Sequence, residues 1–122
     1  MLLNDFFTIV HSSREADSLN TCVKVNAEHS ILKGHFPQQP IVPGVCMMQL
    51  IKEILESETH ETLMLTSADH LKFMTMWIPN DYPELNAEIK TESADDSYKV
   101  IATLQQGETV FFKMKGLFKK MA

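Results

Sequence analysis

The chain has 122 residues, of which 44% are hydrophobic, and its 11 Lys and Arg against 16 Asp and Glu give a net charge of −5. This composition fits one globular domain over residues 1–122 that is large enough to bury its own core. The acidic balance argues against a nucleic-acid ligand, because binding phosphates requires a basic face. Cys22 and Cys46 are too few for a disulfide framework, which indicates free thiols in a reducing compartment.

The start of the chain has no basic segment before its apolar residues, and Asp5 interrupts the apolar run. We therefore expect no secretory signal and a cytoplasmic location. The longest uncharged stretch, residues 34–51, contains Pro37, Pro40 and Pro43. We do not expect this stretch to span a membrane as a helix, because prolines break one.

The first half of the chain predicts two strands and one helix. Phe6 to His11 is apolar and partly β-branched, and Leu19 to Val25 alternates apolar with polar residues, so each predicts a strand, with a turn at 14–17 between them. Residues 28–44 hold two Gly and three Pro and predict an irregular segment.

The strongest helical pattern runs from Val45 to Ser57. Its first turn is apolar on every side, which predicts burial of the amino-terminal end. The polar positions lie in one stripe along the helix, and we expect this stripe to face solvent. These positions are Gln49, Lys52, Glu53 and Glu56.

After residue 61 the sequence predicts only strands, at 63–78, 85–89, 98–104 and 109–118, with turns at 79–81, 94–97 and 105–108. We expect these four segments to form an antiparallel meander. The fold class is therefore α+β, with one antiparallel sheet wrapped around a single central helix. Because one helix covers only one face of such a sheet, we also expect a dimer.

The segment from Gly34 to Gln49 is the part of the chain that indicates chemistry. His35 lies in a loop stiffened by prolines, directly before the predicted helix. The amides of Gly44 and Val45 would lie at the positive end of that helix without partners inside it. Such amides can polarise a carbonyl oxygen while the imidazole moves a proton. The pattern contains no metal-ligand spacing.

This segment resembles the motif of the β-hydroxyacyl-acyl carrier protein dehydratases, hotdog-fold enzymes of fatty-acid synthesis. The family pattern is His-Phe-Pro-x-x-Pro-x-x-Pro-Gly-Val, followed by a helix that carries Glu or Asp. His35-Phe36-Pro37, Pro40 and Pro43-Gly44-Val45 match it at every fixed spacing. The likeness extends over most of the chain and implies a hotdog fold.

The resemblance implies dehydration of a (3R)-hydroxyacyl thioester carried by acyl carrier protein or CoA, with no cofactor and no metal. His35 would remove the α-proton, and the amide of Gly44 would bind the thioester carbonyl. The family's acid position, fourteen residues after the histidine, falls on Gln49. The substrate-contacting positions would be Phe36, Pro43, Val45 and Met48. The family site is built across a subunit interface, which implies a homodimer, an oligomer of dimers, or a heterodimer with another hotdog chain.

Gln49 departs from the family pattern, which has Glu or Asp at this position. An amide can form hydrogen bonds but cannot supply a proton. General acid assistance is typically worth ~10²–10⁴-fold in rate. Glu53, Asp69 and His70 are candidates to replace the missing acid. Two alternatives to a dehydratase follow: an acyl-binding homologue or partner subunit without its own activity, and a hotdog thioesterase.

Lysines gather at the carboxyl end of this acidic chain. Two interpretations stay open for them: a docking surface for an acidic carrier protein, or charges that protect an edge strand from aggregation. The lysines are Lys113, Lys115, Lys119 and Lys120.

Overall fold

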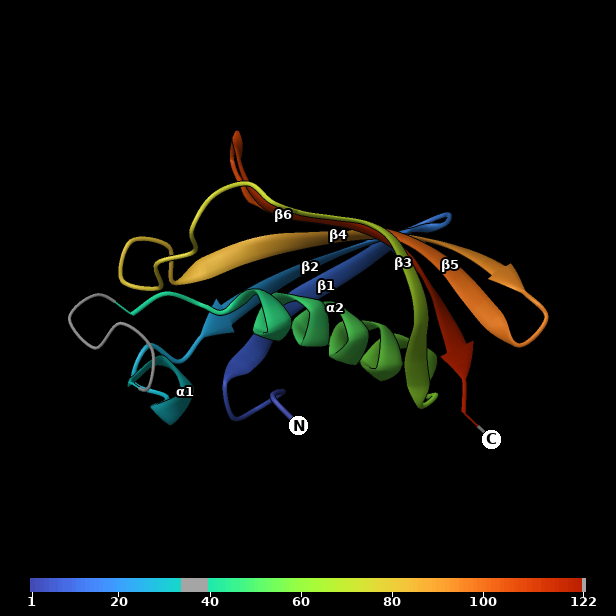
Figure 1. Ribbon diagram of the computed structural model, residues 1–122, viewed down its shortest axis with the longest axis horizontal. Helices are drawn as coiled ribbons and strands as arrows, with labels where there is room; N and C mark the ends of the chain where they lie inside the picture. Colours follow the sequence, from blue (N-terminus) through green and yellow to red (C-terminus); the bar gives the residue numbers. More distant parts are fainter. Residues whose placement is uncertain (34–39, 122) are drawn as a thin grey trace.

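The structure, a computed structural model that describes residues 1–33 and 40–121, opens with a β-hairpin (Figure 1). β1 (Phe7–Glu15) pairs antiparallel with β2 (Ser18–Val25). The turn between them is two residues long, and Ala16 adopts a φ of 51° there. The predicted strands are confirmed, although β1 continues further into the expected turn than its apolar residues indicated.

Two helices follow the hairpin. α1 (Ser30–Lys33) lies in the stretch that we expected to be wholly irregular, so that prediction is wrong for one short turn of helix. α2 (Gly44–Thr59) confirms the predicted helix and extends it by one residue at its start and two at its end. It ends at His60, which takes a left-handed φ of 58° and donates its amide to the carbonyl of Glu56. Within the described part of the chain, neither helix has the length and apolar character that crossing a membrane requires.

The remaining strands are β3 (Leu63–Phe73), β4 (Glu84–Ala94), β5 (Ser97–Gln106) and β6 (Thr109–Lys120). β3 ends at Phe73 and not at Ile78, because the chain then turns inward and buries Trp77, whose indole N–H donates to the carbonyl of Tyr82 at 2.8 Å. The sheet order is β1-β2-β4-β5-β6-β3. The predicted meander is therefore right for β4, β5 and β6 and wrong for β3, which pairs with β6 at one edge of the sheet.

α2 runs beneath the curved sheet, and the core fills the space between them (Figure 1). Leu50, Ile51 and Ile54 of α2 are buried against apolar residues of the central strands. The alternation in β4, with Leu85, Ala87 and Ile89 buried, shows that one face of this strand packs on the core. One sheet wrapped on one central helix confirms the predicted α+β class.

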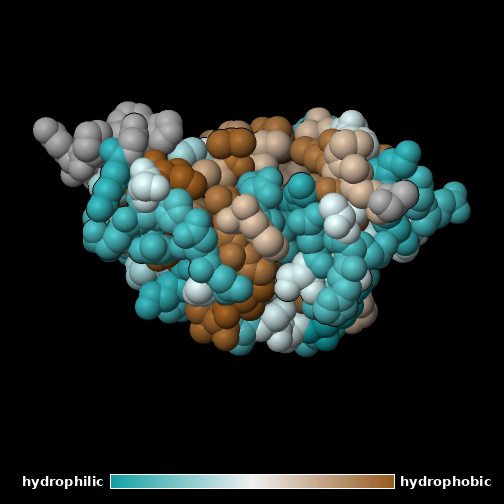
Figure 2. All heavy atoms as spheres, turned by 90° about the horizontal axis from the view of Figure 1, so that it is seen from below, coloured by the Kyte–Doolittle hydropathy of each residue, from teal (hydrophilic) through white to brown (hydrophobic). Residues whose placement is uncertain are grey.

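Two burial predictions for α2 are wrong. Val45, expected inside the core with the rest of the first turn, is 71% exposed. Glu53, expected on a solvated stripe, is 1% exposed. Seen from below the sheet, hydrophobic side chains form a band between hydrophilic ones (Figure 2).

The lysines of β6 do not protect a sheet edge, because β6 lies between β5 and β3. Lys119 and Lys120 lie 3.7 Å and 3.8 Å from Asp96 and Glu61, so both belong to surface ion pairs. Lys113 and Lys115 are exposed and form no ion pair with residues 1–33 or 40–121. Edge protection therefore does not explain these lysines.

Candidate functional site

The amino-terminal end of α2 presents backbone donors that have no acceptor among the described residues. Pro43 is the N-cap residue, with φ −63° and ψ 148°, and it provides no side-chain cap. Its carbonyl accepts the amides of Cys46 and Met47 at 3.0 Å and 3.3 Å. The amides of Gly44 and Val45 donate to no acceptor within residues 1–33 and 40–121. Two donors at the positive end of a sixteen-residue helix suit the developing negative charge of a carbonyl oxygen.

An aromatic ring lies directly against Gly44. A Cβ atom on Gly44 would come within 2.6 Å of Cε1 and 2.8 Å of Cζ in the ring of Phe73. Phe73 also stacks on Phe112, with ring centroids 4.9 Å apart. The absence of a side chain therefore lets the end of β3 approach the first turn of α2.

The predicted site residues fall into two groups. His35 and Phe36 lie outside the described residues, so their predicted roles stay predictions. Pro43, Gly44, Val45, Met48 and Gln49 all lie at the cap and in the first two turns of α2. Val45 is exposed and the other four are half-buried. The helix thus brings together the predicted oxyanion donor and the predicted acid position.

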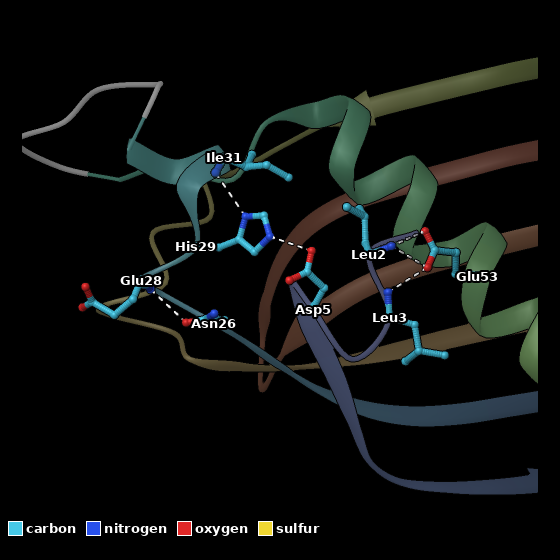
Figure 3. Close-up of polar contacts among 8 residues, drawn as sticks. All are labelled: Leu2, Leu3, Asp5, Asn26, Glu28, His29, Ile31 and Glu53. Atoms are coloured by element: carbon cyan, nitrogen blue, oxygen red, sulfur yellow. Dashed lines mark hydrogen bonds and ion pairs between the residues drawn. The ribbon is translucent and has the colours of Figure 1, made fainter.

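Gln49 is hydrogen-bonded to Glu53 one turn further along α2, with Nε2 2.8 Å from Oε2. Glu53 also accepts the backbone amides of Leu2 at 2.9 Å and Leu3 at 2.8 Å (Figure 3). The carboxylate therefore faces the start of the chain, and both of its oxygens are occupied. Glu53 is poorly placed to replace the missing acid, because a proton on it would displace one of these donors.

The other two candidate acids, Asp69 and His70, are exposed on β3. Asp69 lines a separate cavity of about 590 Å³, which also involves Lys90 and Lys115. His70 pairs with Lys115 across β3 and β6. Neither candidate shares the cap or the first turns of α2.

His29 positions the segment that leads to the motif, a role that sequence reasoning missed. Its Nδ1 accepts the amide of Ile31 at 3.1 Å, so the ring proton is on Nε2, which donates to Asp5 at 3.0 Å (Figure 3). The ring also meets Phe6 edge-on at 5.3 Å. The start of the chain thus braces both α1, through Asp5, and α2, through Leu2 and Leu3. A histidine just before a short helix gave only a weak capping signal.

Neither cysteine is prepared for nucleophilic chemistry. Burial raises the pKa of the Cys46 thiol, and burial together with the neighbouring carboxylate of Glu84 raises the pKa of Cys22. Both thiols are therefore protonated near neutral pH. The described residues also contain no group of three or more His, Cys, Asp or Glu side chains that could hold a metal ion.

Comparison with known proteins identifies the family that the chain resembles. The model of the family described as ApeI-like, ApeI dehydratase, matches residues 11–113. The 3-hydroxyacyl-[acyl-carrier-protein] dehydratase FabZ of Haemophilus influenzae strain Rd is 27% identical over 100 residues, which cover 75% of this chain and 68% of that protein. The protein of the same name from Caulobacter sp. strain K31 is 29% identical over 98 residues, covering 73% and 58%.

Two solved structures share the fold. The Dehydratase Heterocomplex ApeI:P from Xenorhabdus doucetiae contains a chain that superposes with a TM-score of 0.71 at 17% identity, covering 91% of this chain and 96% of that one. A conserved protein from Pseudomonas aeruginosa superposes with a TM-score of 0.63 at 13% identity, covering 94% and 88%. At these identities the likeness demonstrates the hotdog fold alone.

Proposed function

Because the chain belongs to the ApeI-like family of dehydratases, we propose that it eliminates water from a (3R)-hydroxyacyl thioester to give the trans-2-enoyl thioester. The observation that carries this proposal is the open amino-terminal end of α2. There the amides of Gly44 and Val45 have no partner in the described chain, and they directly follow the motif that contains His35. This is the arrangement that stabilises an enolate oxygen formed from a thioester.

The reaction balances with one histidine. His35 takes the α-proton, the C3–O bond breaks, and the C2–C3 double bond forms as the negative charge leaves the thioester oxygen. The proton on the imidazolium then goes to the departing hydroxide, which leaves as water. Gln49 supplies no proton in this scheme. We therefore expect turnover to be slower than in relatives with a carboxylate, by about the 10²–10⁴-fold typical of acid assistance.

The active form in this proposal contains a second hotdog subunit, paired along β3. This strand is an edge of the sheet and is eleven residues long, so its outer backbone groups are open to pairing. Large hydrophobic side chains are exposed on it and just beyond it, at Leu71, Phe73, Met74 and Met76. Because Phe73 also touches Gly44, a subunit on this edge would lie beside the site.

A second candidate function is that of a subunit which binds acyl chains while its partner supplies the acid. Two observations favour it: position 49 carries an amide, and the structural relative from Xenorhabdus doucetiae is described as a dehydratase heterocomplex. In that case the chain alone would bind substrate without turning it over.

The carrier of the substrate in this proposal is an acidic acyl carrier protein, which docks on the lysines of β3 and β6. Lys72 faces Lys113 across the two strands, and His70 faces Lys115 beside them. Like charges directly opposite each other are unfavourable, and a negative partner would relieve them. Lys72 precedes Phe73, whose ring reaches Gly44. The two side chains lie on opposite faces of the sheet, so the acyl arm of a carrier docked here would reach the site around the β3 edge.

Charge reversal tests the docking surface. We expect Lys72→Glu with Lys113→Glu to raise KM for a carrier-protein substrate roughly ten-fold or more at low salt. KM for the matching CoA thioester should change much less. Lys119→Glu is the control, because Lys119 already has a carboxylate partner in Asp96. Equal effects on both substrates would contradict docking at this surface.

The main experiment incubates the protein with a 3-hydroxyacyl-acyl carrier protein and follows the products by intact mass. Loss of water in the wild type that disappears in His35→Ala supports the dehydratase. If the wild type is inactive, Gln49→Glu combined with Glu53→Gln restores a carboxylate at position 49 without placing two carboxylates together. Activity gained only in that double variant indicates the partner-subunit function. Release of free carrier thiol without enoyl product indicates a thioesterase.

A further inference from the structure

Glu53 is a buried acidic side chain whose contacts lie wholly within the fold. It is 1% exposed and accepts hydrogen bonds from Leu2, from Leu3 and from the side chain of Gln49. Burying a carboxylate is costly unless its oxygens are satisfied, and all three partners here are N–H donors. The pair with Gln49 therefore has a definite direction, from the amide nitrogen to the carboxylate.

This direction determines which end of the Gln49 amide remains available. A carboxylate only accepts hydrogen bonds, so the amide must turn its nitrogen towards Glu53 and its oxygen away. Oε1 of Gln49 accepts no hydrogen bond from residues 1–33 or 40–121. Gln49 is half-buried, two turns or less from the free amides of Gly44 and Val45. The site thus contains donors at the helix end and one acceptor further along the helix.

We propose that Glu53 is a positioning residue that holds the oxygen of Gln49 towards the acyl chain, so that position 49 selects ligands with a hydrogen-bond donor at C3. This inference rests on the proposed function, in which a thioester carbonyl lies on the amides of Gly44 and Val45. A 3-hydroxyl group can donate to Oε1 of Gln49. A 3-oxo group is only a hydrogen-bond acceptor, so its oxygen is repelled by the amide oxygen of Gln49. A saturated chain has no polar group at C3.

The substitution Glu53→Gln is predicted to reverse this selection. The glutamine introduced at position 53 keeps an oxygen that can accept the amides of Leu2 and Leu3, and it presents an NH₂ group to Gln49. The amide of Gln49 then turns, because its oxygen now has the better partner, and its nitrogen faces the ligand. A 3-oxo group becomes the favoured ligand. A purely structural role for Glu53 would weaken all ligands together and leave their order unchanged.

Binding is measured with three pantetheine conjugates of octanoyl, 3-hydroxyoctanoyl and 3-oxooctanoyl groups, each with an amide in place of the thioester so that no thioester can hydrolyse. In the wild type we expect the 3-hydroxy compound to bind roughly ten-fold more tightly than the 3-oxo compound, the size of one hydrogen bond gained or lost. In Glu53→Gln the order should reverse. Gln49→Ala should remove the preference while leaving the contacts of Glu53 with Leu2 and Leu3.

Glu56→Gln is the matched control, since Glu56 is on the same helix and accepts the backbone amide of Leu63 at 2.8 Å, but has no contact with Gln49. It should keep the wild-type order. A wild type that binds all three conjugates equally, or a Glu53→Gln variant that keeps the wild-type order, overturns the inference and leaves the dehydratase proposal standing. If the folded wild type binds none of the three, both proposals fail.

A second measurement does not depend on ligand or turnover. The side-chain amide protons of Gln49, identified in an NMR spectrum by their loss in Gln49→Ala, should include one proton protected from exchange by the carboxylate. That protection should disappear in Glu53→Gln and persist in Glu56→Gln. If Gln49 is equally unprotected in the wild type and in Glu53→Gln, Glu53 does not hold it and the inference is wrong.

Discussion

The two ends of α2 differ in whether their polar groups have partners within the fold. At the carboxyl-terminal end the polar groups are tied into the fold: Glu56 accepts the amide of Leu63, and Glu61, just beyond the helix, accepts the hydroxyl of Tyr98. At the amino-terminal end the amides of Gly44 and Val45 have no partner in the described chain. The difference indicates that a functional site is best sought where polar groups have no hydrogen-bond partner within the fold.

Glu53 lies between these two ends and links them. Its bonds to Leu2 and Leu3 belong to the structural half of the helix, whereas its bond to Gln49 reaches the open half. One buried carboxylate can therefore serve stability and also orient a side chain of the site.

The largest predicted difference between the buried and the open parts of α2 is in the free energy of unfolding, when apolar residues are truncated to alanine. Leu50 is 0% exposed, so Leu50→Ala should lower the free energy of unfolding by about 2–5 kcal/mol. Val45 is 71% exposed, so Val45→Ala should change it by less than about 0.5 kcal/mol. Denaturant unfolding at low protein concentration measures both values.

If Val45→Ala proves as costly as Leu50→Ala under those conditions, the amino-terminal end of α2 is not open in solution. A cost for Val45→Ala that appears only as protein concentration rises would instead indicate that a second subunit covers Val45.

A smaller effect is expected at Gly44, where two contributions oppose each other. Alanine is about 1 kcal/mol better than glycine inside a helix, but its Cβ would come within 2.6 Å of the ring of Phe73 and must displace it. We therefore expect Gly44→Ala to change stability by less than about 1 kcal/mol while weakening acyl binding. Thermal unfolding and ligand titration separate the two outcomes.

The double variant Gly44→Ala with Phe73→Ala is the control, because it removes the ring atoms that the added methyl group would meet first. If Gly44→Ala lowers stability equally with and without Phe73, the close approach of the ring is not the reason for the glycine.

The sequence predicted much of the fold, because period-two alternation and one strong helical pattern report local structure and burial. It failed for β3, since pairing with β6 instead of β4 depends on the inward turn around Trp77, a tertiary event with no local pattern. It also misplaced Glu53, because a carboxylate that binds amides fifty residues away looks like any solvated glutamate. The resemblance to the dehydratases predicts roles for Gly44 and Gln49, whereas the direction of the Gln49 amide required the structure.

The smallest effect is a change of stability with pH near the carboxyl-terminal end of α2, of which only a part of about 1 kcal/mol is lost over the range tested. The hydrogen bond from the Tyr98 hydroxyl to Glu61, together with partial burial, raises the pKa of Tyr98 above its ordinary value of 10.0. Because the folded state holds this proton more tightly than the unfolded state, the associated stability is fully present below about pH 10 and is lost as pH rises through the folded-state value. Tyr98→Phe should therefore cost about 1 kcal/mol at pH 7. The difference between the two proteins should shrink above pH 10.

The raised pKa values of Cys22 and Cys46 are common to both proteins and cancel in the comparison. Urea unfolding at pH 7, 9 and 10.5 measures the trend, and a difference that stays constant up to the highest pH would show that the bond to Glu61 does not contribute to folding.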